Sequence, residues 1–274
     1  IIPIIAKGLT KRYQTYKNRP VDIIIAENMR SANEFICEEL KKYLADDFPI
    51  DNYVGLIETS IGKMVPIMTA EEIKKDPLSV FAEPYNQLIL DKKGFKNHIP
   101  TVNGLAPKEN IKAWVDRKAF IHNLGHATAA YYGHFKHPDA TYLYEVLDDK
   151  NVLDFTKEVM LQSANILLKV YPNDLTSADL STHIDDLLFR FQNKSLKDTI
   201  FRVGQDIPRK LAPNDRFMGI IRLAASLEMP YDKILKAMSY AFYFKAVDKN
   251  GDRAEQDIIF EKQLSEGINL TLQK

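Results

Sequence analysis

The sequence predicts an α/β segment followed by a mostly α-helical one. Residues 1–100 contain short apolar runs typical of buried strands, among them the isoleucine-rich VDIII of residues 21–25. After residue 108 the apolar residues recur at helical spacing instead. Between the two, FKNHIPTVNGLAP (residues 95–107) collects the Gly, Pro and Asn of a domain boundary. We therefore expect one domain over residues 1–100 and a second over residues 101–274.

The first segment reads helix, strand, helix, strand, strand. IIPIIAKGLTKRYQ (residues 1–14) has the pattern of an amphipathic helix, without an initiator methionine or a signal-peptide layout, so we expect the natural N-terminus to lie upstream. VDIIIAEN predicts a buried strand with Asn28 at its carboxyl end, where open α/β sheets bind ligands. A helix is expected over residues 31–44, and further strands within residues 53–68 and 83–91.

The second segment predicts a series of helices separated by proline. Helical spacing of apolar residues covers 108–134, 151–170, 177–191, 214–228 and 230–244. Prolines 138, 172, 213 and 230 fall between these segments or at their starts, where proline is tolerated.

Composition is that of a soluble globular protein. Of the 274 residues 45% are hydrophobic and 27% charged, and the formal net charge is zero, so no basic excess points to nucleic acid. The one cysteine excludes an internal disulfide, and no apolar run reaches the roughly 18–20 residues of a membrane helix. We expect a cytoplasmic monomer or weak oligomer with neither nucleic-acid nor membrane partners.

RKAFIHNLGH (residues 117–126) places Lys118, His122, Asn123 and His126 in an otherwise apolar run. On an α-helix the last three side chains lie about 40°, 140° and 80° round from Lys118, so one pocket could contact all four. This spacing is compatible with three interpretations: a metal site, a catalytic pocket, or a row of polar residues in the core.

The metal interpretation has the weakest support. His122 and His126 are four residues apart, but Asn123 stands where the metalloprotease pattern needs a glutamate, and a lysine opposes a divalent cation. We expect no metal, and we interpret His122, His134 and His137 as helix-packing residues.

Lys118 is the candidate base. Burial among apolar residues lowers the pKa of an amine, and a neutral amine accepts a proton from an alcohol. Asn123 offers an amide donor to the resulting oxygen. The alternative is a lysine that extends to solvent beside a polar seam.

These residues fit a known pattern. Lys118, Asn123 and His126 match K-x4-N-x2-H of the long-chain mannitol dehydrogenase family, the polyol-specific, zinc-independent dehydrogenases. IIPIIAKGLTKR, IIIAENM and the stretch of residues 190–217 also resemble that family. The resemblance implies the C-terminal part of a Rossmann-type domain, a multi-helical substrate domain and NAD as cofactor.

The resemblance also implies roles for single residues. Lys118 matches the general acid–base, and Asn123 and Asn28 match the asparagines that hold the reacting oxygen. His126, Arg202 and Lys210 match substrate contacts.

A basic cluster indicates the substrate. Arg202, Arg209, Lys210 and Arg216 lie within fifteen residues and would bind a phosphate dianion. The alternative is a solvated basic loop paired with Asp206 and Asp215. The first interpretation, and the branch of the family that residues 190–217 resemble, predict interconversion of D-mannitol 1-phosphate and D-fructose 6-phosphate. Free mannitol, a hexuronate, or a non-catalytic module of the same architecture remain as alternatives.

Two departures from the family are visible. Gly62 in IGKMVP replaces an aspartate, and the sequence contains no GxGxxG. Because a pyrophosphate binds at such a glycine turn, no residue is assigned to the cofactor, and residues 1–274 alone are expected to bind NAD weakly.

Overall fold

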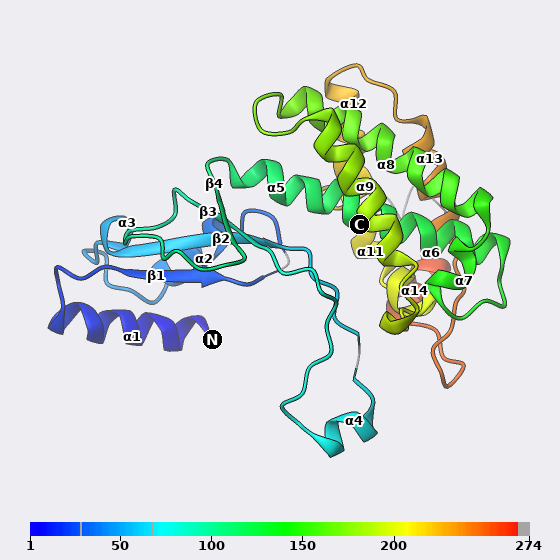
Figure 1. The fold of residues 1–274 in the computed structure, drawn as a ribbon. Coiled ribbons are helices and arrows are strands. Elements are labelled where there is room, and N and C mark those ends of the chain that lie inside the picture. The colour runs from blue at the N-terminus through cyan, green and yellow to red at the C-terminus, as the bar shows by residue number, and fades with distance from the viewer. Residues whose placement is uncertain (28, 67, 268–274) are drawn as a thin grey trace. The chain divides into compact units, whose positions relative to one another are not determined.

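The computed structural model describes residues 1–27, 29–66 and 68–267 (Figure 1). It divides into two compact units. The first comprises Ile1–Lys63 and Pro84–Asp116, and the second comprises Met64–Glu83 and Arg117–Lys274. An α/β unit and a mostly helical unit confirm the predicted fold class.

The first unit is built on a four-stranded sheet of order β1-β2-β3-β4. The strands are β1 (Val21–Ile25), β2 (Val54–Ile61), β3 (Leu88–Asp91) and β4 (Leu105–Lys108). β1 and β2 are parallel, β2 and β3 antiparallel, and β3 and β4 parallel. β4 lies inside the stretch that composition marked as a boundary, because residues 105–108 pair with β3 in spite of the Pro and Gly around them.

The burial predicted for β1 is wrong. Only Ile25 is buried among its five residues, and Ile24 is 46% exposed. Within the described sheet β1 pairs with β2 alone, so it is an edge strand, and an edge strand lacks a neighbour on one side.

Helices cover this sheet and form its core. They are α1 (Ile2–Thr15), α2 (Ala32–Lys41), α3 (Ile50–Tyr53) and α5 (Ile111–Arg117). Ala6 and Leu9 of α1 pack with Leu40 of α2 and with Tyr53 and Val54. The connection through α2 joins two parallel strands, as a βαβ unit requires.

The second unit is a bundle around α6 (Leu124–Lys136), which packs against α7, α8 and α10. Its remaining helices are α4 (Ala70–Lys75), η1 (Lys118–Asn123), α7 (Leu143–Leu147), α8 (Lys150–Val170), α9 (Ser177–Phe191), η2 (Lys194–Leu196), α10 (Ile200–Gly204), α11 (Ile207–Lys210), α12 (Met218–Ser226), α13 (Asp232–Ser239), η3 (Tyr240–Tyr243) and α14 (Glu255–Ser265). The helices predicted over 151–170 and 177–191 match α8 and α9 closely. No helix among the described residues is long and apolar enough to span a bilayer.

The segment 64–83 belongs to this unit through a buried ion pair. Glu83 accepts from the backbone N–H of Met64 at 2.6 Å and from Nε of Arg190 in α9 at 2.8 Å. Both side chains are almost fully buried, so the end of the segment is fixed on the bundle.

Candidate active site

The residues RKAFIHNLGH do not form the continuous α-helix that their spacing predicted. Lys118–Asn123 is a π-helix, η1, inserted between α5 and α6. A π turn closes its hydrogen bonds five residues apart instead of four and is frequent at functional sites. The angles expected for an α-helix therefore do not hold through this turn.

Contacts from outside the helix hold the π turn. Ser163 Oγ of α8 donates to the carbonyl of Phe120 at 2.6 Å, and Arg216 Nη1 donates to the carbonyl of Asn123 at 3.4 Å. Gly219 lies so close to Phe120 that a Cβ there would stand 2.7 Å from the ring. The turn is thus built into the packing of the bundle.

Lys118 has the electrostatic environment of a base. Burial, and secondarily the charge of Arg216, lower the pKa of its amine from 10.5 to about 8. Arg216 is itself buried and pairs with Asp215, Nε to Oδ1, at 2.8 Å. The charge that acts together with burial is therefore that of a guanidinium. Near pH 8 a large fraction of the amine is neutral and able to accept a proton.

His126 lies between an aromatic ring and a carboxylate. Its ring stacks on Phe191 with centroids 4.6 Å apart, and its Nε2 is 3.0 Å from Oδ2 of Asp198. This contact is an ion pair when the ring is protonated. The same Asp198 accepts from the guanidinium of Arg202. Two predicted substrate contacts, His126 and Arg202, thus meet at one carboxylate.

The other histidines of this region have packing or pairing partners. His122 is buried beside Phe191, and burial holds its pKa well below the usual value. His134 is buried against Phe244, and Nε2 of His137 lies 2.8 Å from Asp149. Within residues 1–27, 29–66 and 68–267 no three His, Cys, Asp or Glu side chains gather in a way that could hold a metal ion.

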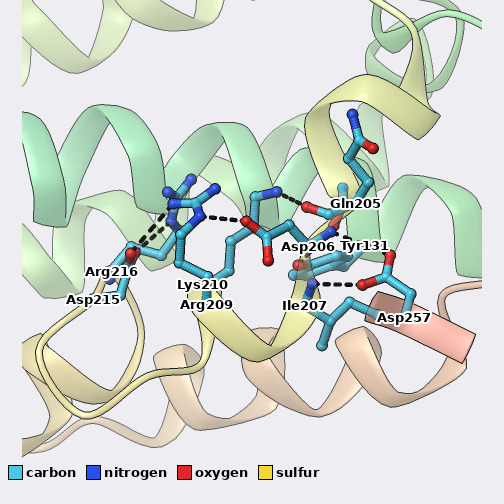
Figure 2. Close-up of polar contacts among 10 residues, drawn as sticks. Tyr131, Gln205, Asp206, Ile207, Arg209, Lys210, Asp215, Arg216 and Asp257 are labelled. Carbon is cyan, nitrogen blue, oxygen red and sulfur yellow. Dashed lines mark hydrogen bonds and ion pairs between the residues drawn. The ribbon is translucent and has the colours of Figure 1, made fainter. Parts of the chain in front are cut away.

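The basic cluster is paired and partly buried (Figure 2). Arg209 contacts Asp206 and lies 3.5 Å from Asp215, which also binds Arg216. Lys210 donates to the carbonyl of Gln205. The pairing with Asp206 and Asp215 that the solvated-loop interpretation predicted is therefore present. Part of the loop, however, is buried and not solvated.

Lys210 is the most buried member of this cluster, at 4% exposure. Burial, followed by the charges of Arg216 and Arg209, lowers the pKa of Lys210 to about 7. The short helix α11 that carries it is capped by Asp257 of α14, which accepts from the N–H of Ile207 at 2.7 Å (Figure 2). A second amine in this unit thus changes its charge near neutral pH.

Asp198 is not among the site residues predicted from the sequence, although it stands four residues before Arg202, as in a helical ion pair. The contact of Arg216 with the π-helix was not predicted either, because Asn123 lies 93 residues away in the sequence. Asn28 lies outside the described residues.

Residues 1–104 match the family model "Mannitol dehydrogenase Rossmann domain", and residues 110–269 match "Mannitol dehydrogenase C-terminal domain". A mannitol-1-phosphate 5-dehydrogenase of Streptococcus mutans serotype c is 30% identical over 259 residues, 93% of this chain and 65% of that protein. One from Streptococcus pneumoniae is 30% identical over 250 residues, 90% and 64% of the two chains. The chain thus spans about 65% of the length of these relatives.

Two solved structures share the fold. A substrate-free D-sorbitol dehydrogenase superposes with a TM-score of 0.74 at 18% identity, covering 93% of this chain and 54% of the other. The ternary complex of Pseudomonas fluorescens mannitol 2-dehydrogenase with NAD and D-mannitol gives 0.71 at 18% identity, covering 97% and 56%.

Proposed function

Because the chain belongs to the mannitol dehydrogenase family, we propose that it carries the substrate-handling part of an NAD-dependent polyol dehydrogenase. The observation that carries the proposal is the lowered pKa of Lys118 at the start of a π-helix. In this proposal residues 1–100 form the C-terminal portion of the dinucleotide-binding domain and residues 101–274 the substrate domain. The substrate pair is D-mannitol 1-phosphate and D-fructose 6-phosphate, which the names of the 30%-identical relatives support.

The chain's own residues would handle the hydroxyl. The neutral amine of Lys118 takes the proton of the substrate alcohol, and in the reverse direction its ammonium returns it. Asn123 donates an amide N–H to the same oxygen, which carries negative charge as the proton leaves. A matching role for Asn28 rests on the family pattern. When bound, NAD supplies the hydride acceptor.

The first unit fits part of a dinucleotide-binding sheet. β1 and β2 are parallel, and α2 connects them. Dinucleotide-binding domains are built from such strand–helix–strand units. The glycine turn that binds a pyrophosphate has no counterpart in this sequence. No residue of the chain is therefore assigned to NAD.

Phosphate selection is proposed for the basic cluster. Arg209 is half exposed, so it can exchange an aspartate partner for a phosphate oxygen. Lys210 stands next to it, and protonation of this amine beside a dianion would add a second charge.

Comparing kcat/KM for mannitol 1-phosphate with kcat/KM for mannitol tests both parts of the proposal, the dehydrogenase activity and the selection of a phosphorylated substrate. We expect a preference for the phosphate that falls about tenfold or more in Arg209→Gln, while the efficiency on mannitol stays unchanged. Arg222→Gln is the matched control, since Arg222 contacts Pro213 and Asn214 on an exposed surface. Equal efficiency on both substrates would remove the phosphate assignment. In protein shown by titration to bind NAD, no turnover of either substrate would remove the polyol dehydrogenase itself.

A further inference from the structure

We infer that Asp198 is a positioning residue that joins His126 and Arg202 into one unit for substrate binding. The inference rests on the proposed function for what the unit binds. Its physical content, a carboxylate that contacts both side chains and favours the protonated form of His126, does not depend on it.

The contacts are short, and the carboxylate at their centre is buried. Oδ2 of Asp198 faces Nε2 of His126 at 3.0 Å, and Oδ1 accepts from Arg202. The side chain of Asp198 is 7% exposed, whereas that of Arg202 is 36% exposed. The buried carboxylate of Asp198 is therefore held by two basic partners. The guanidinium of Arg202 extends from it toward solvent.

The backbone around Asp198 is also fixed. Its carbonyl accepts from the N–H of Leu143 at 2.9 Å, and the next residue, Thr199, forms an isolated β-bridge with Tyr142. Thr199 then caps α10, its side chain accepting from the N–H of Arg202. Because hydrogen bonds hold the backbone on both sides of Asp198, the position of its carboxylate is fixed. The side chains of His126 and Arg202 are therefore positioned by Asp198.

Asp198 and Arg202 act on His126 with opposite sign. Burial lowers the pKa of His126, Asp198 raises it, and Arg202 and Arg216 lower it further. A second titratable ring, that of His122, has its centroid 6.1 Å from the centroid of the His126 ring. Burial would raise the pKa of Asp198, but its contacts with His126 and Arg202 outweigh this and keep it below the usual value, so the carboxylate is ionised at neutral pH.

The test is the titration of the His126 ring by NMR in the chain of 274 residues labelled at histidine. Asp198→Asn removes the charge that favours the imidazolium, so the pKa of His126 should fall. Arg202→Gln removes a charge that opposes it, so the pKa should rise. Asp149→Asn is the matched control, since Asp149 makes the same kind of contact with His137 at 2.8 Å. That variant should leave the titration of His126 unchanged.

Each outcome decides the inference. Opposite shifts in Asp198→Asn and Arg202→Gln support it, and no shift or shifts of the same sign overturn it. If Asp198→Asn fails to fold, Arg202→Gln alone decides, because Arg202 is partly exposed and its loss leaves the core intact. In active enzyme, Asp198→Asn should raise the KM for mannitol 1-phosphate about tenfold or more and lower kcat less. Absence of any polyol turnover in unaltered protein that binds NAD would refute the proposed function and leave the titration result standing.

Discussion

The guanidinium of Arg216 reaches the carbonyl oxygen of Asn123, the last residue of the π-helix, at 3.4 Å. The same charge lowers the pKa of Lys118, the first residue of that helix. Arg216, in the loop before α12, therefore has two effects on the π-helix. It donates a hydrogen bond to the last residue, and its charge favours the neutral amine of the first.

Arg216→Gln should move the pH profile of polyol oxidation to higher pH. Oxidation requires the neutral amine, so the rate should rise as pH passes through about 8, the pKa of Lys118. Loss of the repelling charge raises that pKa and shifts the rise with it. Arg216→Lys keeps the charge and should keep the profile. An unmoved profile in Arg216→Gln would mean that Arg216 does not tune the base.

Lys118→Met should make the protein more stable at neutral pH. The folded state lowers the pKa of this amine from 10.5 to about 8, so the unfolded chain binds more protons between these values and stability rises with pH across that window. Below pH 8 the full penalty of burying the ammonium applies, and its removal should stabilise by roughly 1–3 kcal/mol.

Urea unfolding at pH 7 and near pH 10 measures this effect. The gain from Lys118→Met should shrink at the higher pH. Lys136→Met, at an exposed position of the last turn of α6, should change stability little at either pH. A gain that does not depend on pH would show that the amine is not desolvated.

Ser163→Ala should destabilise the protein by about 0.5–1.5 kcal/mol, because it removes a buried side-chain hydrogen bond to the carbonyl of Phe120. Ser239→Ala removes a bond of similar length, 2.7 Å to the carbonyl of Lys236, at an exposed site. Denaturant midpoints compare the two. Equal effects would mean that the π turn does not depend on α8.

Gly219→Ala and Gly8→Ala should change stability in opposite directions. A Cβ at Gly219 would stand 2.7 Å from the Phe120 ring and 3.1 Å from the carbonyl oxygen of Asn214, so overpacking should destabilise by about 1–3 kcal/mol. A Cβ at Gly8, inside α1, meets nothing within 4 Å and should stabilise by about 0.5–1 kcal/mol. Thermal unfolding gives both signs, and a stabilising Gly219→Ala would contradict the close packing on η1.

The elements set by local periodicity were predictable. α8 and α9 follow the 3.6-residue spacing of their apolar residues, and α2 and β2 were placed in order. The exposure of β1 was not, because an edge strand and a central strand have the same apolar run. β4 was missed since its pairing with β3 is set by the sheet and not by its own Pro-containing sequence.

The candidate site was predictable in its residue types and not in its geometry. Lys118, Asn123 and His126 lie within nine residues of sequence, so the motif K-x4-N-x2-H was enough to predict them. The π turn depends on Ser163 and Arg216, which reach it from other helices and loops. No spacing within RKAFIHNLGH encodes those contacts.

The central claim is that Lys118 is the base, and turnover of Lys118→Met tests it most directly. In active enzyme, kcat for mannitol 1-phosphate oxidation should fall by about 10²–10⁴-fold, while Lys136→Met stays within about twofold. Because the same substitution is expected to stabilise the fold, loss of activity would not come from unfolding. Normal turnover in folded Lys118→Met would contradict the account.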